Sequence, residues 1–442
     1  MELLFVTSEY CGAKISGAHG SQSRHSERPK LIFNSGLQKT SYIASALLLF
    51  APLRMEPLPA SRCPFPIDDL VPIIIQQASL TYHPKDLAKL SLVSSVWLGA
   101  TRRILYSSPH IRSYHSCHLL SRTLADKPYF GNRIRALRLH PVSRICPTGG
   151  KCPCREVNTI ALSLTPLFRL ENLSELSLGG DCAIHSEWYL RSFHYTEGIT
   201  KVRVEGMQWY WSFEVNRPIN ASLRWNESLA SRYQNLKYLE LMNVDLRICE
   251  LQVFKPHLPH LETLIMDRVR ITHGNLSNIA FDAWQNLREL TVVVPEYSPN
   301  YDVKTILLQA AQNLQALKYC IKEESPRNDL HSVIGVDVLA SCTSLRDLQL
   351  SVLFKTSALK ALGQRLTQLE LLKVFGNYEV DIEEWAVEIM NGIFPKLREI
   401  SLPIGHELRR LADWQWSALR VGTIRRACES RGIALTYVYL PD

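Results

Sequence analysis

The chain has 442 residues, of which 46% are hydrophobic and 21% are charged, so it has the composition of a globular protein and the length of two or three domains. Its formal net charge of +8 is uneven, because residues 61–140 hold 11 Lys and Arg against 4 Asp and Glu, whereas residues 141–442 hold 33 against 34. A nucleic-acid reader needs a basic stripe along its binding face, and the neutral C-terminal region disfavours that function.

Residues 1–60 are expected to form a disordered extension. Residues 1–30 are polar and rich in Gly and Ser after a short apolar start. An apolar run at residues 41–53 is too short to cross a bilayer and too far from the N-terminus for a signal peptide. Met55 precedes the first helical pattern, which suggests the hypothesis that translation starts there. Abundant peptides from residues 1–54 in N-terminal mass spectrometry would contradict that hypothesis.

A helical module is expected at residues 61–112. Pro66 with Asp68 and Asp69 suits a first helical turn, and an apolar face follows at steps of three and four residues. The segment Ser79–Pro84 is expected to end this helix, after which Asp86 would cap a second one. The first helix contributes Leu70, Ile73, Ile74 and Gln77–Ala78, and the following stripe contains Leu87, Leu90, Leu92, Val93, Val96, Trp97, Ala100 and Ile104.

The stretch from Phe65 to Trp97 resembles an F-box, the motif by which substrate receptors dock on the Skp-family adaptor of cullin-RING ubiquitin ligases. The Leu-Pro opening of the family appears as Phe65-Pro66, its Asp-Leu as Asp86-Leu87, and its Val-x-x-x-Trp as Val93 to Trp97. The continuation WLGATRRILYSSPHIRS is similar to fungal F-box proteins. The chain departs from the pattern at Asp69, at Ala78 and in a long first loop, Ser79–Lys85. The resemblance implies docking through Pro66, Leu70, Ile73, Ile74, Leu87, Leu90, Val93 and Trp97.

An alternative interpretation is that this module only caps the end of a repeat array. The two interpretations differ at Leu70 and Trp97. If they are core residues of a cap, truncation of either side chain would lower the stability of the protein by about 3–5 kcal/mol. As interface anchors, they would leave folding almost intact and act as binding hot spots.

Leucine units of the form Leu-x-x-Leu-x-Leu recur after residue 112. The middle residues Leu239, Leu264, Leu290 and Leu317 are separated by 25, 26 and 27 residues, and the period continues through Leu348, Leu372 and Ile400. This period is typical of leucine-rich repeats, in which each unit forms one short strand and a return. The alternative is an unrelated α/β fold with parallel strands, which the regular spacing and the absence of Gly-rich strand-to-helix turns disfavour. Earlier units are Ile134-Leu137-Leu139 and Leu173-Leu176-Leu178.

The repeats predict a curved solenoid with a parallel sheet over residues 113–442. Helices are expected at Tyr114–Leu124 and in the returns Val303–Gln312, Val333–Ser341, Ser357–Arg365 and Ile382–Asn391. Residues between the inward leucines should line a concave sheet of mixed charge, which favours binding of a protein or peptide over a phosphate backbone. The candidate target-binding residues are Tyr238, Glu240, Ile265, Asp267, Glu289, Thr291, Lys318, Asp347, Gln349, Lys373 and Phe375.

Two irregular insertions interrupt the period, at about residues 140–172 and 180–235. In the second, Ile199, Val202 and Val204 predict a degenerate strand. Its aromatic residues could anchor an interface or fill a satellite core under a long loop, and the sequence leaves both possibilities open. These residues are Trp188, Tyr189, Tyr195, Trp209, Tyr210, Trp211 and Trp225.

No metal site, cofactor or catalytic centre is expected. Cys146, Cys152 and Cys154 with His140 offer four soft ligands but lack paired Cys-x-x-Cys spacing. The chain has no nucleophile elbow, His-Glu-x-x-His helix or dinucleotide fingerprint. Its eleven cysteines indicate reduced thiols in the cytoplasm or nucleus.

The sequence therefore predicts an α/β protein in which a short three-helix F-box module precedes a leucine-rich-repeat solenoid. The resemblance implies a non-catalytic substrate-recognition adaptor of a Skp–cullin–F-box E3 ubiquitin ligase, whose partners would be the Skp-family adaptor and a protein target, without nucleic acid or membrane. The alternative is a leucine-rich-repeat interaction scaffold without ligase function.

Overall fold

The computed structural model describes residues 67–81, 84–142, 164–207, 211–212, 217–218, 221–249, 258–280, 284–294, 298–321, 330–351, 355–375, 381–402 and 414–437. The chain forms two compact units, Met1–Ile104 and Leu105–Asp442. The expected N-terminal extension, Met55 and the apolar run at 41–53 lie outside the described residues.

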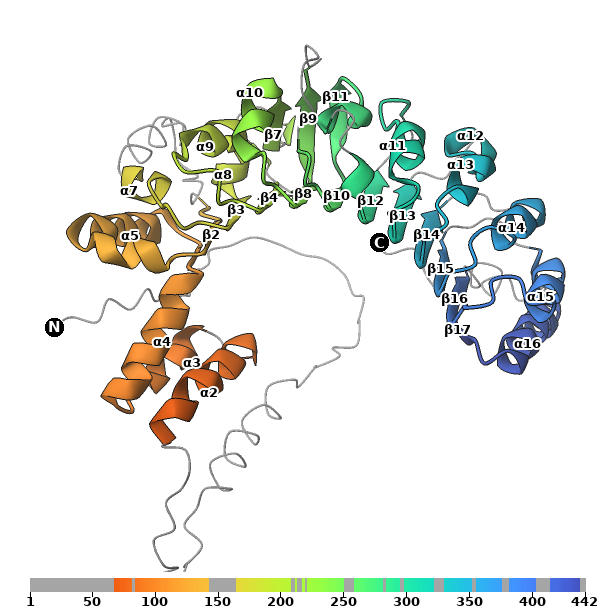
Figure 1. The fold of residues 1–442 in the computed structure, drawn as a ribbon, viewed down its shortest axis with the longest axis horizontal. Helices are drawn as coiled ribbons and strands as arrows, with labels where there is room; N and C mark the ends of the chain where they lie inside the picture. Colours follow the sequence, from red (N-terminus) through yellow and green to blue (C-terminus); the bar gives the residue numbers. More distant parts are fainter. Residues whose placement is uncertain are drawn as a thin grey trace, which may run out of the picture. The chain divides into compact units, whose positions relative to one another are not determined.

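The described part of the first unit is helical (Figure 1), and its core is thin. It contains α2 (Ile67–Thr81), α3 (Pro84–Leu90) and most of α4 (Ser95–Ser107). Val71, Ile75 and Ala100 form its buried cluster, and the partly buried Leu90, Val96, Trp97 and Ile104 pack against that cluster. The apolar stripe expected on the third helix is therefore present, although only three buried residues form the centre of this core.

The structure corrects the expected helix boundaries of this unit. Helix α2 continues through Ser79 to Thr81 instead of ending at Ala78. Helix α3 begins at Pro84, so Asp86 lies inside its first turn and is not the cap. The reason is that proline is well suited to a first helical position, where its missing N–H has no intrahelical partner.

Helix α2 has two apolar faces, and the expected apolar face, which includes Leu70, Ile73 and Ile74, is not the one that points inward. Val71, Ile75 and Ala78, spaced by four and three residues, are buried. Leu70, Ile73 and Ile74 lie about 100° around the helix and are exposed. Both faces are apolar, so the helical periodicity alone could not identify which one packs against α3 and α4.

The boundary between the units lies within α4, earlier than the expected module end at residue 112. The backbone N–H of Arg135 donates to the carbonyl of Ser107 at 2.8 Å, and β1 (His110–Ile111) pairs with β2 (Ala136–Leu139). Residues 105–112 therefore pack with the repeats because their backbone groups complete the first strand pairing of that unit.

The second unit is built on a twelve-stranded sheet in the order β1-β2-β3-β4-β8-β10-β12-β13-β14-β15-β16-β17, and all its pairings are parallel. Figure 1 shows the strands along the inner side of this unit and most helices along its outer side. The expected leucine units supply nine of the strands, and Val202 and Val204 lie in β4 as expected. The strands after β2 are β3 (Glu175–Gly179), β4 (Lys201–Glu205), β8 (Tyr238–Met242), β10 (Thr263–Asp267), β12 (Glu289–Val294), β13 (Ala316–Ile321), β14 (Asp347–Ser351), β15 (Leu371–Val374), β16 (Glu399–Leu402) and β17 (Ala434–Tyr437).

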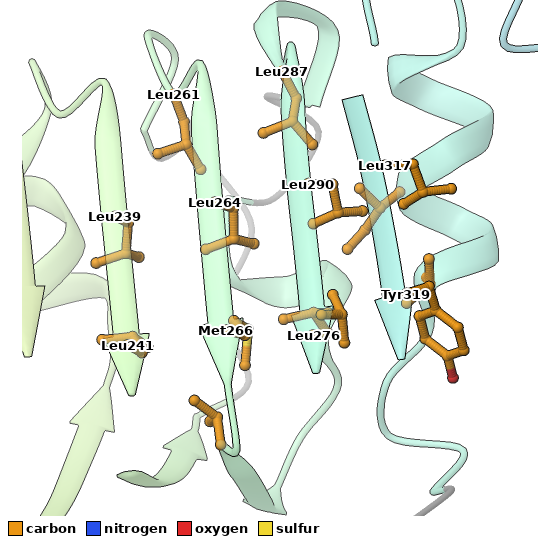
Figure 2. Close-up of a cluster of buried hydrophobic side chains, with 14 of the residues drawn as sticks. Leu239, Leu241, Leu261, Leu264, Met266, Leu276, Leu287, Leu290, Leu317 and Tyr319 are labelled. Carbon is orange, nitrogen blue, oxygen red and sulfur yellow. The ribbon is translucent and has the colours of Figure 1, made fainter. Parts of the chain in front are cut away.

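The strand register stacks equivalent leucines from one repeat to the next (Figure 2). Leu264 pairs with Leu239 on one side and with Leu290 on the other, and Leu290 pairs with Leu317. All four are at most 1% exposed. Because side chains alternate along a strand, this register places every leucine of the set on the face of the sheet that packs into the core, which we call the inward face. The residues between the leucines lie on the opposite face of the sheet, which we call the outward face.

Crossover segments connect the strands, as parallel pairing requires, and most of those described contain an α-helix. Four of these helices are close to the expected positions, and α5 (Tyr114–Asp126) lies at the expected helix after the module. The final return, α16 (Trp414–Ser430), precedes β17, and neither was expected. The other returns are α7 (Thr165–Phe168), α8 (Asp181–Ile184), α9 (Ser186–Ser192), α10 (Glu227–Ala230), α11 (Val303–Ala310), α12 (Leu330–Val333), α13 (Val336–Ala340), α14 (Thr356–Gly363) and α15 (Ile382–Met390).

A second sheet begins within the interval taken as irregular from the sequence, about residues 180–235, and continues beyond it into segments that follow β8 and β10. It has the order β11-β9-β7, with β7 (Ala221–Trp225), β9 (Val244–Ile248) and β11 (Arg270–His273) in parallel. A short antiparallel pair is formed by β5 (Trp211–Ser212) and β6 (Arg217–Pro218). The inward residues of β7, including Trp225, belong to the same continuous core as the leucines.

Asparagine side chains form hydrogen bonds between neighbouring repeats, at the end of the sheet where the strands begin. The Nδ2 groups of Asn235, Asn286 and Asn313 donate to the carbonyls of Glu197, Pro259 and Gln285, at 2.9, 2.7 and 2.7 Å. Each bond joins one repeat to the preceding one, and each asparagine directly precedes a core leucine in the sequence. These residues satisfy turn carbonyls between repeats.

Candidate functional site

The first unit exposes apolar side chains that its own core leaves uncovered. Leu70, Ile73 and Ile74 of α2 are 43%, 63% and 46% exposed, and they share one helix face. We call these three residues the α2 face. Between α3 and α4, Leu92 and Val93 are 65% and 63% exposed. Uncovered apolar side chains on a small module are typical of a binding surface.

The residues expected to dock a partner divide into two groups. Leu70, Ile73, Ile74 and Val93 are exposed. Leu87 is buried, and Leu90 and Trp97 pack against the module core. Pro66 lies outside the described residues. The exposed residues can contact a partner directly, whereas Leu87, Leu90 and Trp97 would act by holding the helices in place.

The expected target-binding residues lie together on the outward face of the main sheet. The strand register pairs Glu240 with Ile265, Ile265 with Thr291, Thr291 with Lys318, Lys318 with Gln349 and Gln349 with Lys373. A parallel row begins at Tyr238 and includes Glu289 and Asp347. Asp267 lies at the end of β10, and Phe375 directly follows β15. Most of these residues are half-buried, and Glu240 is buried.

Polar contacts hold several of these side chains in place. The Tyr238 hydroxyl donates to Glu240 Oε2 at 2.9 Å, and Lys201 Nζ lies 4.3 Å from the centre of the Tyr238 ring. Burial and the Glu240 carboxylate raise the pKa of Tyr238 well above its usual value, so its hydroxyl stays protonated. The central part of the surface is therefore a preorganised polar patch.

The C-terminal part of the surface holds carboxylates that are only partly neutralised. Gln349 Nε2 donates to both carboxylate oxygens of Asp347, at 3.1 and 3.2 Å, and Lys373 Nζ lies 3.4 Å from Glu399 Oε1. Burial raises the pKa of Asp347. This region can donate and accept hydrogen bonds along a bound chain.

Sequence reasoning missed the N-terminal end of the same rows. His110, Arg138, Ser177 and Arg203 are adjacent in the strand register, and His140 directly follows β2. The signal was available, because Arg138 and Ser177 lie between core leucines of two units that the repeat pattern already identifies.

The aromatic residues of the second insertion are divided between the core and the surface. Tyr189 and Trp225 are buried, whereas Trp188 and Tyr195 are 45% and 48% exposed. Trp188 packs edge-on against Phe168, with ring centres 5.7 Å apart. The side chains of Trp209, Tyr210 and Trp211 lie outside the described part of the chain.

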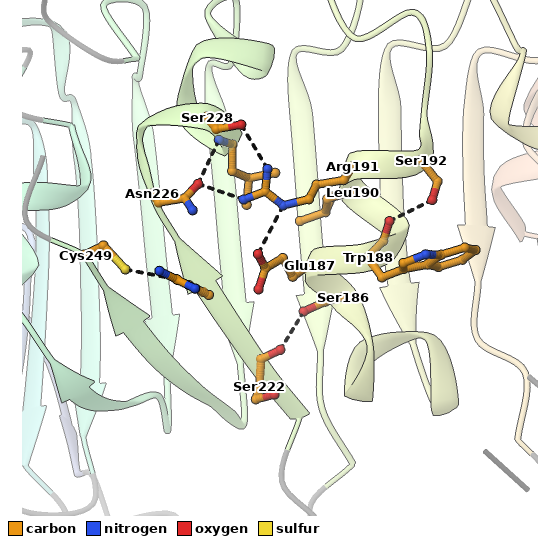
Figure 3. Close-up of polar contacts among 12 residues, drawn as sticks. Ser186, Glu187, Trp188, Leu190, Arg191, Ser192, Ser222, Asn226, Ser228 and Cys249 are labelled. Carbon is orange, nitrogen blue, oxygen red and sulfur yellow. Dashed lines mark hydrogen bonds and ion pairs between the residues drawn. The ribbon is translucent and has the colours of Figure 1, made fainter. Parts of the chain in front are cut away.

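An arginine network fixes the helix that carries Trp188 (Figure 3). Arg191 contacts Glu187 Oε1 at 3.1 Å, Asn226 Oδ1 at 2.8 Å and Ser228 Oγ at 3.0 Å. Ser186 Oγ donates to the Ser222 carbonyl at 3.1 Å. These contacts join α9 to β7 and α10, so the network has a structural role.

The cysteines of the described core are not activated nucleophiles. Burial raises the pKa of Cys117 to about 12 and those of Cys320, Cys342 and Cys428 to about 11. Thiols with such pKa values are protonated near neutral pH and react slowly.

Within the described residues no group of three or more His, Cys, Asp or Glu is arranged to hold a metal ion. Cys146, Cys152 and Cys154 lie outside them, so the structure shows only the fourth candidate ligand, His140. The described helices also include none that is long and apolar enough to cross a membrane.

Comparisons with known proteins give a structural likeness only. No protein-family model matches the chain, and no curated protein matches it. Among solved structures, an internalin from Listeria monocytogenes matches with 15% sequence identity and a TM-score of 0.32, covering 76% of this chain and 88% of the internalin. The parallel sheet and its leucine register themselves establish a leucine-rich-repeat solenoid.

Proposed function

We propose that this chain is a substrate-recognition adaptor of a Skp–cullin–F-box E3 ubiquitin ligase. The helical unit would bind the Skp-family adaptor, and the outward face of the main sheet would bind a protein target. Catalysis would come from proximity, because a bound target experiences a high effective concentration of the ubiquitin-conjugating enzyme. No catalytic residue of this chain is needed, and the complex would act in the cytoplasm or nucleus.

The observation that supports docking is the α2 face. Leu70, Ile73 and Ile74 are apolar and exposed, whereas the neighbouring Val71 and Ile75 are fully buried. A helix with one face in its own core and a second apolar face in solvent is suited to pack against another helical protein. The occupant is inferred from the F-box resemblance of Phe65 to Trp97.

A pair of matched substitutions tests this proposal. Ile73→Asp places a charge on the α2 face, and Leu308→Asp places the same charge on an exposed leucine of α11, which is 56% exposed. Each variant of the full chain would be co-expressed with a Skp-family adaptor and isolated by affinity capture. We expect the wild type and Leu308→Asp to retain the adaptor and Ile73→Asp to lose it, with unchanged thermal unfolding.

A third variant separates docking from folding. Ile75→Ala removes buried contacts of the thin core and should lower the unfolding temperature, whereas Ile73→Asp should leave it unchanged. If the folded wild type does not capture the adaptor, the ligase proposal is wrong.

The alternative is an interaction scaffold without ligase function. The polar patch of the main sheet favours protein binding whatever the helical unit does. Affinity capture during proteasome inhibition distinguishes the two functions, because a ligase receptor should yield both the adaptor and ubiquitin-conjugated target. A scaffold should yield unmodified partners without the adaptor.

A further inference from the structure

Three arginines and two histidines lie together at the N-terminal end of the main sheet, in a group that we call the cationic corner after its arginines. It consists of His110, Arg112, Arg138, His140 and Arg203. The register pairs His110 with Arg138, Arg138 with Ser177, and Ser177 with Arg203, so the group spans four adjacent strands. Arg112 follows β1 directly.

The histidine pair of the cationic corner has a defined geometry. His140 Nε2 lies 2.8 Å from Ser177 Oγ, and the His110 and His140 rings meet edge to face with centres 5.1 Å apart. The His140 ring lies over Gly179, where an added Cβ would lie 2.6 Å from Nδ1. Only glycine leaves this space, so the main chain of β3 and the Ser177 hydroxyl together hold the ring.

The charge of the corner is only partly neutralised. Arg203 pairs with Glu205 at 3.0 Å and lies 3.7 Å from Glu240. Among the described residues, no ion pair joins Arg112 or Arg138 to a carboxylate. Burial, and to a smaller extent Arg112, His140 and Arg138, lower the pKa of His110 to about 4, so this imidazole is neutral near pH 7. The positive charge of the corner therefore comes from its arginines, and an anion placed beside Arg112 and Arg138 would be attracted.

The remainder of the sheet limits the kind of anion. Asp267, Glu289, Asp347 and Glu399 lie on the outward face of the central and C-terminal strands, where they outnumber Lys318 and Lys373. A polyanion that followed the whole sheet would be repelled over these strands. A polypeptide with a local acidic segment would meet attraction at the corner and remain compatible with the carboxylates farther along.

We propose that the cationic corner binds an acidic segment of a partner protein, through carboxylate side chains that face Arg112 and Arg138. This inference names the class of segment that the sheet would recognise in the proposed function. It does not depend on docking of the helical unit.

The test measures binding of a synthetic peptide to the full chain by fluorescence polarisation. The probe is a labelled peptide rich in Glu, and the reference peptide has Gln at every Glu position. The site variant combines Arg112→Glu with Arg138→Glu. The control is Arg247→Glu, because Arg247 is an exposed arginine on β9 of the second sheet.

We expect the Glu peptide to bind the wild type more tightly than the Gln peptide. The double variant should weaken binding on the order of tenfold, because each attraction becomes a repulsion. Binding of the Arg247→Glu chain should equal that of the wild type. Affinity for the Glu peptide should fall as salt is raised, since both arginines lie at the surface.

Three results would overturn the proposal. The first is equal affinity for the Glu and Gln peptides, and the second is equal loss of affinity in Arg247→Glu. The third is tighter binding of a single-stranded oligonucleotide than of the Glu peptide, which would indicate a nucleic-acid site. Thermal unfolding of each variant checks folding, and Arg138→Gln gives a milder second variant. Capture of the Skp-family adaptor by the double variant is measured in a separate experiment. Failure of the peptide test can therefore be distinguished from failure of the ligase proposal.

Discussion

The helical unit and the solenoid hold themselves together in different ways. The solenoid has one continuous core from Ile111 to Ile433, in which each repeat covers the leucines of the next. The helical unit has three buried residues in its cluster and leaves the α2 face exposed. Stability in the solenoid therefore comes from stacking between neighbours, whereas the described helical unit has apolar surface that a partner could cover.

The largest expected effect tests the stacked core of the solenoid. Leu264→Ala removes a fully buried side chain between Leu239 and Leu290 and should lower the free energy of unfolding by about 2–5 kcal/mol. The same substitution at the exposed Leu308 should change it by less than about 0.5 kcal/mol. Denaturant unfolding measures both. Equal costs would show that stacking of the leucines does not dominate the stability of this unit.

Two Gly→Ala substitutions, one in each unit, should change the stability of the protein in opposite directions. At Gly206, which follows β4, an added Cβ would lie 2.1 Å from the carbonyl oxygen of Asn243 and 2.8 Å from Ala221 Cβ, so we expect a loss of about 1–3 kcal/mol. At Gly99 in α4 nothing lies within 4 Å, and alanine should stabilise the helix by about 0.5–1 kcal/mol. Thermal unfolding of the two variants compares the close packing of the solenoid with the open surface of α4. Destabilisation by Gly99→Ala would show that the surface of α4 is covered within this chain.

Alkaline pH should weaken the solenoid through its buried thiols. Burial raises the pKa of Cys342 from 9.0 to about 11. Between these values the unfolded thiol releases a proton that the folded thiol keeps, so the free energy of unfolding falls as pH rises. Each such thiol contributes a slope of at most about 1.4 kcal/mol per pH unit. Chemical denaturation of the wild type and Cys342→Ala from pH 8.5 to 10.5 should show a shallower slope for the variant. Equal slopes would indicate that Cys342 ionises in the folded protein.

The regular strands could be predicted from sequence because leucine spacing and strand alternation report the same inward face. Leu239, Leu264 and Leu290 occur at a steady period, and their pairing follows from stacking one unit on the next. The second sheet could not be predicted in this way. Its strands depend on turns such as that at Asn243, whose positive φ of 51° separates β8 from β9.

The candidate surfaces were predictable only in part. Outward positions such as Thr291 and Lys318 follow from the alternation of side chains along a strand. The residues of the α2 face were expected to dock a partner only from the F-box resemblance. Helical periodicity alone could not show that they are exposed, because Leu70 and Val71 lie on different faces that are both apolar. The contact between His140 and Ser177 joins residues 37 positions apart and depends on the glycine at 179, so it needs the register of two strands.

The smallest expected difference between the units is in the coupling energy of their surface ion pairs. In the solenoid, Arg270 makes two contacts with the carboxylate of Asp245, at 3.1 and 2.8 Å, across neighbouring strands. In the helical unit, Lys89 reaches Asp86 at 3.4 Å and both side chains are exposed.

A double-mutant cycle with alanine should give a coupling energy of about 0.5–1 kcal/mol for the bidentate Arg270–Asp245 pair, because the neighbouring strands fix its geometry. The Lys89–Asp86 pair should give a coupling energy of less than about 0.5 kcal/mol, because solvent weakens the attraction between the exposed charges and the long Lys89 side chain loses rotamer freedom. Raising the salt concentration should reduce both couplings. A coupling at Lys89–Asp86 as large as that at Arg270–Asp245 would mean that the helical unit is held more rigidly than its thin core implies.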